Sequence, residues 1–291
     1  MKTSLDCIPC FLRQSLEAAR FVSDDHAFHE YILRKVLKIM IDIDLMQSPA
    51  VVAQWIHRQI REITGQEDPY RNAKERFTEA ALILLPEFSA QVEASADPIE
   101  AAVRIAIAGN MIDMGPENVL TPEGVRQTVL QAFSEPLYGD LESFKRAIEA
   151  AKSILYLADN AGEIVLDQVL IERLPLGQTT LVVRGHPVIN DATMADIEAI
   201  NLNRFLTVTD NGSDAPGTIL DDCSSQFREL FKSADLIIAK GQGNYETLSD
   251  EPKAIFFLLK VKCKVIASRV GLDMGTHAIL PSGFWAQGTR S

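Results

Sequence analysis

Three clusters of polar residues whose types could do chemistry lie in the second half of the chain, each just after a short apolar run. The first is Asp159-Asn160, which is followed by Gly162 and Glu163. Asp and Asn side-chain oxygens are hard ligands suited to Mg²⁺ or Mn²⁺. Ligands of an open α/β sheet bind beyond the carboxyl ends of its strands, so this position predicts a hard-metal or phosphate site. A helix cap and a turn would use the same residue types.

The second cluster follows the next apolar run and comprises Arg184 and Asn190-Asp191. Asp191 could reach the same metal as Asp159. Arg184 could either lie near a phosphate or pair only with a surface acid. A structural helix cap at Asn190 or Asp191 is the strongest alternative interpretation of this cluster.

The third cluster is Lys240-Gly241, with Gly243 two residues later. Glycines expose backbone N–H groups that can cradle an anion, and Lys240 would add a point charge. Glycines are also common where parallel strands turn, so this cluster alone is weak evidence. A shared site is favoured because polar clusters follow three separate predicted strands. A further pair, Asn110 and Asp113, ends a helical region and could face the same crevice or simply terminate the helix.

The elements that would position these clusters fall into two regions. Apolar residues recur at helical spacing from residue 8 to about 108, with breaks at Ser48-Pro49 and Asp68-Pro69, and further helices are expected at about 121–133 and 141–151. From Ser153 onward the pattern changes to short β-rich runs separated by helical stretches. These runs lie at 154–158, 180–183, 205–208, 236–239 and 265–267.

Such an alternation predicts right-handed βαβ units and therefore an α/β fold. We expect a helical subdomain, residues 1–150, packed on a doubly wound, mostly parallel, Rossmann-like sheet that forms a catalytic subdomain, residues 151–291. Since large α/β enzymes often bind ligands between subdomains, the helical part is expected to form one wall of the pocket. Its residues would then set substrate choice.

The composition limits the possible partners. With 47% hydrophobic and 23% charged residues, the chain is typical of a globular protein. Its net charge of −12 argues against nucleic acid as a partner, whereas a small anionic substrate is compatible if a metal neutralises it locally. No apolar run reaches the roughly 20 residues of a membrane span, and the start lacks a secretory signal, so we expect no membrane partner and a cytoplasmic location.

Other chemistries find less support in the sequence. Cys7 and Cys10 have redox or zinc spacing, but Cys223 and Cys263 supply no second pair, and buried thiols that pack a helix are the favoured interpretation. No GxSxG nucleophile motif is present. Attack by a metal-activated water therefore fits better than a covalent route, although Asp159 as a nucleophile stays open.

In this order, the clusters resemble the damage-control phosphatase family, over nearly the whole chain. The resemblance rests on six short motifs: Cys7-Ile-Pro-Cys10 with Gln14, Asp68-Pro69-Tyr70 with Lys74, Gly109-Asn110-Met-Ile-Asp113, Asp159-Asn160-Ala-Gly162-Glu163, Asn190-Asp191-Ala-Thr193 and Lys240-Gly241-Gln242-Gly243-Asn244-Tyr245. The paired cysteines make the chain most similar to the archaeal and bacterial branch. The Arg-Thr-x-Lys signature of the eukaryotic sugar-phosphate branch is not visible, so the substrate cannot be carried over.

The resemblance implies hydrolysis of small phosphomonoesters with a divalent metal such as Mn²⁺, Co²⁺, Ni²⁺ or Mg²⁺. Its substrate would be a small phosphorylated metabolite, with sugar phosphates, nucleotides and damaged phosphometabolites all open, and a homo-oligomer is compatible with it. By this likeness Asp159, Asn160 and Asp191 would be the metal ligands and catalytic residues. Glu163 and Lys240 would contact the substrate, with Gly241 and Arg184 beside them, while Asn110 and Asp113 would line the pocket.

Two other classes of protein compete with this hypothesis. An α/β transferase could use the glycine loops to bind the phosphates of a nucleotide or cofactor, although no GxGxxG follows the first strand. A non-catalytic module could hold a metal or ligand at the strand ends for stability alone. Lys240 beside an open crevice favours catalysis over the second alternative.

Overall fold

The structure, a computed structural model, describes residues 1–110 and 121–283. Within these ranges the chain forms a seven-stranded sheet in the order β1-β7-β6-β5-β2-β3-β4. The strands are β1 (Leu137–Tyr138), β2 (Ile154–Leu157), β3 (Thr179–Val183), β4 (Thr207–Asp210), β5 (Leu236–Lys240), β6 (Ile255–Lys260) and β7 (His277–Pro281). Neighbours pair in parallel except β6 and β7, so the predicted mostly parallel α/β sheet is confirmed.

Both faces of the sheet are buried, because successive side chains of a strand point to opposite sides. In β2, Ile154 and Tyr156 enter one hydrophobic core, whereas Leu155 and Leu157 enter the other. Strands that are apolar on both faces need helices on both faces, which explains the doubly wound arrangement.

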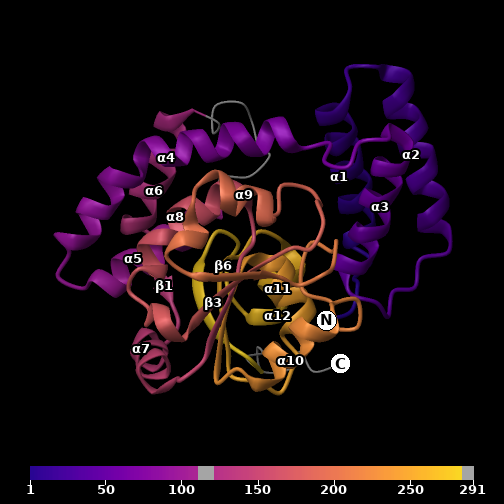
Figure 1. Ribbon diagram of the computed structural model, residues 1–291. Helices are drawn as coiled ribbons and strands as arrows, with labels where there is room; N and C mark the ends of the chain where they lie inside the picture. The colour runs from indigo at the N-terminus through magenta and orange to yellow at the C-terminus, as the bar shows by residue number, and fades with distance from the viewer. Residues whose placement is uncertain (111–120, 284–291) are drawn as a thin grey trace.

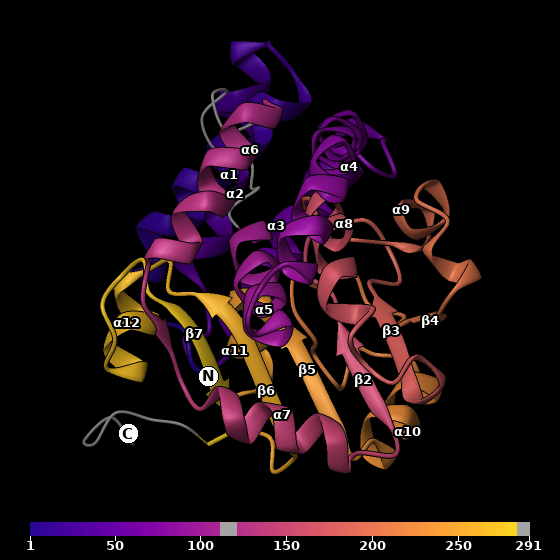
Figure 2. The ribbon, with the colours of Figure 1, turned by 90° about the vertical axis from the view of Figure 1, so that its left-hand side faces the viewer.

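One face is covered by helices from both halves of the chain (Figures 1 and 2). They are α4 (Arg71–Glu93), α5 (Pro98–Gly109), α6 (Pro122–Ser134), α7 (Leu141–Ala150), α8 (Ala161–Ile171) and α9 (Met194–Ala199). The other face is covered by α10 (Ser225–Ser233), α11 (Gly241–Leu248) and α12 (Lys264–Val270). Two short 3₁₀ helices, Leu176–Gln178 and Leu202–Arg204, precede β3 and β4.

The first three helices enclose a hydrophobic core of their own. They are α1 (Cys7–Val22), α2 (His26–Ile41) and α3 (Pro49–Thr64), the indigo helices gathered at one side of the molecule in Figure 1. Each has an apolar stripe at helical spacing, such as Ile32, Val36 and Met40 in α2, that packs against its neighbours.

Polar contacts join this three-helix group to the loop after β4. Arg58 and Arg61 of α3 both form ion pairs with Asp214, and the Arg61 side chain also donates to the carbonyl of Pro187 at 2.6 Å. Gln54 of the same helix donates to Asp214 at 2.6 Å. The arginines hold the pKa of Asp214 at about 2 although burial alone would raise it.

Two strand predictions need correction. Residues 265–267, predicted as a strand, lie inside helix α12, and the strand of that region is β6, residues 255–260. Short apolar runs do not distinguish a buried strand from a buried helical segment, which explains the error. The predicted strand 205–208 lies two residues further on, as β4.

The division into subdomains 1–150 and 151–291 remains a prediction. Helices α4–α7 lie within residues 1–150 and yet share a core with the sheet, whereas α1–α3 have a separate core. None of the helices in the described ranges is both long and apolar enough to cross a membrane.

Candidate active site

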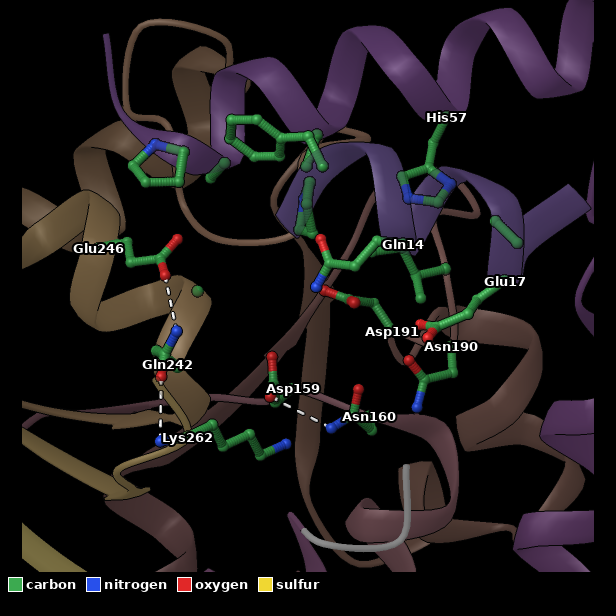
Figure 3. A pocket seen from close by; sticks show the side chains of 18 residues that line it. Gln14, Glu17, His57, Asp159, Asn160, Asn190, Asp191, Gln242, Glu246 and Lys262 are labelled. Atoms are coloured by element: carbon green, nitrogen blue, oxygen red, sulfur yellow. Dashed lines mark hydrogen bonds between the residues drawn. The ribbon is translucent and has the colours of Figure 1, made fainter. Parts of the chain in front are cut away.

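A cavity of about 390 Å³ lies where the three-helix group faces the carboxyl ends of the strands (Figure 3). It is lined by Phe11, Gln14, Glu17, Ala18, Pro49, Ala50, Ala53, His57, Asp159, Asn160, Ile189, Asn190, Asp191, Pro216, Gln242, Gly243, Glu246 and Lys262. Helices α1 and α3 form one wall, so the prediction that the helical region walls the pocket is confirmed. Three of the lining residues, Asp159, Asn160 and Asp191, were the predicted metal ligands.

Asp159 and Asn160 stand between the end of β2 and the first turn of α8. The Asn160 side-chain amide donates to Asp159 Oδ2 at 3.2 Å and to Glu163 Oε2 at 2.9 Å. These bonds use the Asn160 nitrogen, which leaves its side-chain oxygen directed into the cavity (Figure 3). Asn160 is the N-cap residue of α8 but makes no capping bond with its side chain, so the interpretation as a simple helix cap fails for it.

Asp191 is brought to the same place by the loop after β3. The Ala161 N–H donates to the carbonyl of Asn190 at 2.8 Å, and Asn160 and Asp191 form an isolated β-bridge. Ile189, two residues before Asp191, has a φ of 45°, which is unfavourable for a β-branched residue. The following helix is capped instead by Thr193 and Asp196, so Asp191 is not needed as a cap.

The two carboxylates are mutually repulsive. Burial raises the pKa of Asp159 well above its ordinary value, and the charge of Asp191 raises it further. The pKa of Asp191 is also raised by burial, against the opposing effect of Arg184. A divalent cation would relieve this repulsion, and two carboxylates with an amide oxygen form a hard donor set suited to Mg²⁺ or Mn²⁺. The residues present therefore fit a divalent metal.

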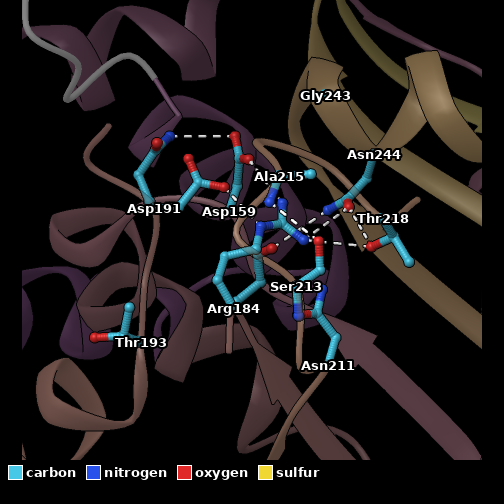
Figure 4. A network of polar contacts seen from close by, with 12 residues as sticks. Asp159, Arg184, Asp191, Thr193, Asn211, Ser213, Ala215, Thr218, Gly243 and Asn244 are labelled. Atoms are coloured by element: carbon cyan, nitrogen blue, oxygen red, sulfur yellow. Dashed lines mark hydrogen bonds and ion pairs between the residues drawn. The ribbon is translucent and has the colours of Figure 1, made fainter. Parts of the chain in front are cut away.

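Arg184 lies in a buried polar network rather than at the surface (Figure 4). Its Nε atom donates to Asp191 Oδ2 at 2.7 Å, and its Nη2 atom lies 3.7 Å from Asp159 Oδ1. Its Nη1 atom donates to Thr218 and Asn244, both at 3.3 Å. The alternative that Arg184 pairs with a surface acid is wrong, because its partners are the two site carboxylates.

Lys240 and Glu163 lie beneath the cavity rather than in it. Both side chains are completely buried. The Lys240 ammonium forms ion pairs with Glu163 and with Asp167, the latter at 2.7 Å, and donates to the carbonyl of Ala106 at 2.8 Å. The structure thus departs from the predicted substrate contacts of Lys240 and Glu163. The sequence predicts that the backbone of a lysine after an apolar run lies at the edge of the sheet. It does not predict the direction of the side chain, which here turns back into the core.

Asn110 supports the site from the same buried layer. Its side-chain amide donates to Asp159 Oδ2 and to Glu163 Oε2, both at 2.7 Å. Asn110 is fully buried and does not line the cavity, so its contact is with the carboxylate of Asp159 rather than with a ligand. The predicted pocket residue Asp113 lies outside the described residues.

Gly241 leaves room for the Asp159 carboxylate. Its φ is 77°, and a Cβ atom built there would overlap the Asp159 carboxylate. The absence of a side chain at Gly241 therefore makes room for a candidate ligand. The predicted role of Gly241 in cradling a phosphate stays a prediction.

A model of a known protein family matches almost the whole chain. The family model described as the damage-control phosphatase ARMT1-like domain matches residues 3–277. The chain belongs to the damage-control phosphatase family. The resemblance found in the sequence motifs is thereby confirmed.

Members of the damage-control phosphatase family occur among its similar proteins. The chain is 36% identical to a damage-control phosphatase of Archaeoglobus fulgidus, over 94% of this chain and 97% of the relative. It is 33% identical to an uncharacterised protein of Methanocaldococcus jannaschii, over 96% and 95% of the two chains. The crystal structure of a DUF89 family protein from Pyrococcus horikoshii has a TM-score of 0.87, with 29% identity over 97% of this chain and 99% of the other.

Several lining residues of this damage-control phosphatase were missed by the sequence interpretation. Glu17, His57, Glu246 and Lys262 had been given no role in the site. Lys262 follows strand β6, and the signal that could have found it is the one used for Lys240, a lysine just after an apolar strand. The misplaced strand at 265–267 concealed that position.

The cysteines form no evident metal centre. Cys7 packs in the core of the three-helix group, as expected for a buried thiol, whereas Cys10 is only half-buried, and all four cysteines are free. Within residues 1–110 and 121–283, no three His, Cys, Asp or Glu side chains are grouped to hold an ion. The candidate metal site has two such residues, Asp159 and Asp191, with the amide of Asn160 beside them.

Proposed function

We propose that this damage-control phosphatase hydrolyses small phosphomonoesters with the help of a divalent metal such as Mn²⁺, Co²⁺, Ni²⁺ or Mg²⁺. Family membership supports phosphatase activity. The observation that carries the metal-dependent proposal is the convergence of Asp159, Asn160 and Asp191 on one wall of a cavity large enough for a small metabolite. The substrate would be a small phosphorylated metabolite of the cytoplasm.

Asp159, Asn160 and Asp191 would hold the metal through their side-chain oxygens. When bound, the metal would offset negative charge on the phosphoryl group and lower the pKa of a coordinated water. Arg184 holds the Asp191 carboxylate, and the amides of Asn110 and Asn160 hold the Asp159 carboxylate. These bonds fix the ligands before substrate arrives, which lowers the cost of ordering them during the reaction.

Lys262 would bind a phosphate oxygen, in place of the originally predicted Lys240. It lines the cavity, and its charge lowers the pKa of Asp159 against the larger effect of burial, so its ammonium lies close to the candidate ligands. The Lys262 ammonium donates to the carbonyl of Asn110 at 2.7 Å, which fixes the side chain. A lysine held in this way is a suitable point charge for a phosphate.

The geometry favours hydrolysis over the transferase alternative. A nucleotide-binding transferase would use the glycine loop after β5 to hold phosphates, but Gly241 packs against Asp159. We therefore infer that the phosphate binds between Asp159, Asp191 and Lys262. A water is the proposed nucleophile, because two amides restrain the Asp159 carboxylate as a ligand.

The test is hydrolysis of p-nitrophenyl phosphate by protein stripped with a chelator and then supplied with Mn²⁺, Co²⁺, Ni²⁺ or Mg²⁺. We expect a metal to restore turnover in the parent, and Asp159→Asn, which keeps the side-chain shape, to lose at least about 10²-fold in kcat. Asp221→Asn, an exposed acid outside the cavity, is the matched control. Equal turnover in Asp159→Asn and the parent would refute the proposed ligand role.

A further inference from the structure

Asn190 lines the cavity and has no role in the site as described so far. Its side chain is buried and lies with Asn160 and Asp191 on one side of the cavity (Figure 3). The Nδ2 atom of Asn190 has no hydrogen-bond partner within residues 1–110 and 121–283. In those ranges Asn190 is the one cavity-lining residue with such a buried, unpartnered side-chain atom. A buried donor without a partner costs stability, so its presence needs an explanation.

The backbone around Asn190 is firmly held. Its carbonyl accepts a hydrogen bond from the Ala161 N–H at 2.8 Å, and the Asp191 N–H donates to the carbonyl of Val188 at 3.0 Å. Ile189, immediately before Asn190, has a φ of 45°. Strain of this kind persists only where the surrounding structure fixes it, and it is concentrated at functional sites. The loop after β3 therefore fixes the Cα–Cβ direction of Asn190 as well as that of Asp191.

A structural role does not account for the Asn190 amide. The following helix, α9, is capped by Thr193 and Asp196, so the sequence-based alternative of a helix cap at Asn190 is wrong. The bond that ties this loop to Ala161 uses the backbone carbonyl of Asn190 rather than its side chain. Removal of the Nδ2 donor would therefore break no hydrogen bond within the part of the chain that the structure describes.

Two other amides at the strand ends are already engaged. The Asn160 amide donates to two neighbouring carboxylates, at 3.2 and 2.9 Å. The Gln242 amide donates to Glu246 at 2.9 Å and to the Cys263 sulfur at 3.6 Å. Since an amide nitrogen carries two hydrogens, both donors are used in each case. Asn190, by contrast, keeps its amide hydrogens for a ligand of the cavity.

The free donor suits an oxygen acceptor that carries negative charge. Asn190 stands directly before Asp191, in the region where the proposed function places the phosphoryl group. A phosphoryl group has three non-bridging oxygens, and a metal with the single ammonium of Lys262 does not meet all of their acceptor positions. A donor fixed in advance stabilises such charge without being reordered during the reaction, and its bond to a charged oxygen is stronger than a neutral one.

We propose, on the basis of the proposed function, that Asn190 is a further substrate-binding residue, whose Nδ2 amide donates a hydrogen bond to a non-bridging oxygen of the phosphoryl group. The strained loop after β3 then serves both halves of the site, with Asp191 for the metal and Asn190 for the phosphate. Inorganic phosphate has the same kind of oxygens, so the product should use the same donor. The role is independent of the alcohol part of the substrate.

The test replaces Asn190 by leucine, which has nearly the same shape and no donor. Binding of inorganic phosphate to the Mn²⁺-loaded protein is measured by calorimetric titration, and the affinity for Mn²⁺ alone is measured on the same variant. We expect the Kd for phosphate to rise at least about tenfold, because a bond to a charged oxygen is lost. The Kd for Mn²⁺ should change less than about threefold. KM for p-nitrophenyl phosphate should rise with the phosphate Kd, and kcat should change less.

Two further variants complete the test. Asn190→Ala removes the donor without any risk of a clash and should shift both constants in the same way. Asn72→Leu makes the same substitution at an exposed position of α4 outside the cavity and should leave both unchanged. Unchanged phosphate affinity in the Asn190 variants, or no phosphate binding by the parent, would overturn the proposal. So would a loss of Mn²⁺ affinity as large as the loss of phosphate affinity, which would make Asn190 a metal ligand, or failure of Asn190→Ala to fold.

Failure of the proposed function has a separate signature. In that case p-nitrophenyl phosphate would not be hydrolysed with any of the metals. The phosphate titration requires no turnover, so the parent and the Asn190 variants still decide whether this amide binds phosphate.

Discussion

Lys262 and Lys240 differ in the surroundings of their ammonium groups. Lys240 is completely buried between Glu163 and Asp167, whereas Lys262 lines the cavity beside Asp159. Burial by itself would lower the pKa of Lys240, but the two carboxylates raise it, so this lysine is charged in the fold. One lysine is thus part of the structure below the site, and the other lines the cavity.

Substitution of each lysine by methionine should separate these roles. Lys240→Met leaves two buried carboxylates without their cation, and we expect a loss of about 3–5 kcal/mol in the free energy of unfolding. Lys262→Met should change stability by less than about 1 kcal/mol and raise KM for p-nitrophenyl phosphate about tenfold or more. Urea unfolding and steady-state kinetics measure the two effects, and an exchange of the two outcomes would contradict the assignment.

Gly241→Ala tests the space reserved for Asp159. A Cβ atom at this position displaces the Asp159 carboxylate, and an alanine at a φ of 77° costs roughly 1–2 kcal/mol in backbone strain. We expect lower thermal stability and a loss of about 10²-fold in kcat. Gly177→Ala is the matched control, since a Cβ atom there meets no atom within 4 Å. An unchanged kcat in Gly241→Ala would show that the position of the carboxylate is not critical.

At the scale of elements, the site depends on where strands end and helices begin. The sequence predicted that Asp159 and Asp191 would meet, because the runs before them are short, apolar and rich in β-formers, and β2 and β3 are indeed neighbours. It could not predict which lysine enters the cavity. A strand end fixes the position of the backbone, whereas the direction of a long side chain depends on the packing around it.

The wall supplied by α1 and α3 was predicted only in outline. An amphipathic helix shows in its sequence which face is buried but not which partner covers it. His57 carried no recognisable motif, and its contact with Tyr70 joins α3 to the residue just before α4, which lies 13 positions away. Such tertiary contacts are the part of the site that local pattern does not contain.

The buried His57 should make α3 sensitive to acid. Its pKa of about 3 in the fold lies below the ordinary value of 6.5, so the unfolded chain takes up a proton that the folded chain does not, and stability falls as the pH drops below 6.5. At pH 5 this amounts to about 2 kcal/mol. His57→Gln should remove that part of the loss between pH 7 and pH 5, as measured by urea unfolding.

A second buried histidine provides the internal reference for this experiment. Burial lowers the pKa of His277 to about 4, so its own contribution to the acid sensitivity should persist in His57→Gln. Identical pH dependence in the parent and the variant would contradict the buried, neutral state of His57.

At the scale of the whole molecule, the three-helix group, with its own hydrophobic core, must be held against the sheet, which has a core on each face, to form one cavity. The three-helix group has its own core, and Asp214 connects it to the loop after β4 through Arg58 and Arg61. The sequence predicted an α/β protein with a helical part at its start. It did not predict this connection, because a charged loop residue has no pattern that identifies a partner about 150 positions earlier.

Asp214→Asn should weaken the connection between the three-helix group and the loop after β4. It leaves two arginines without their shared anion, and we expect a loss of about 2 kcal/mol in stability. Hydrogen exchange should accelerate in α1–α3 more than in β2 and β5, because the three-helix group can then open locally. Asp221→Asn, an exposed acid in the same loop, is the control, and uniform acceleration over all elements would contradict a local connection.

We propose that the strand-end oxygens hold the metal on which phosphate hydrolysis depends. The most direct measurement is a titration of the chelator-stripped parent with Mn²⁺, in which bound metal and p-nitrophenyl phosphate turnover are recorded on the same samples. We predict that turnover rises in proportion to bound Mn²⁺ and reaches its maximum when one site is filled. Full turnover in the presence of chelator, or saturation with Mn²⁺ without turnover, would contradict the account.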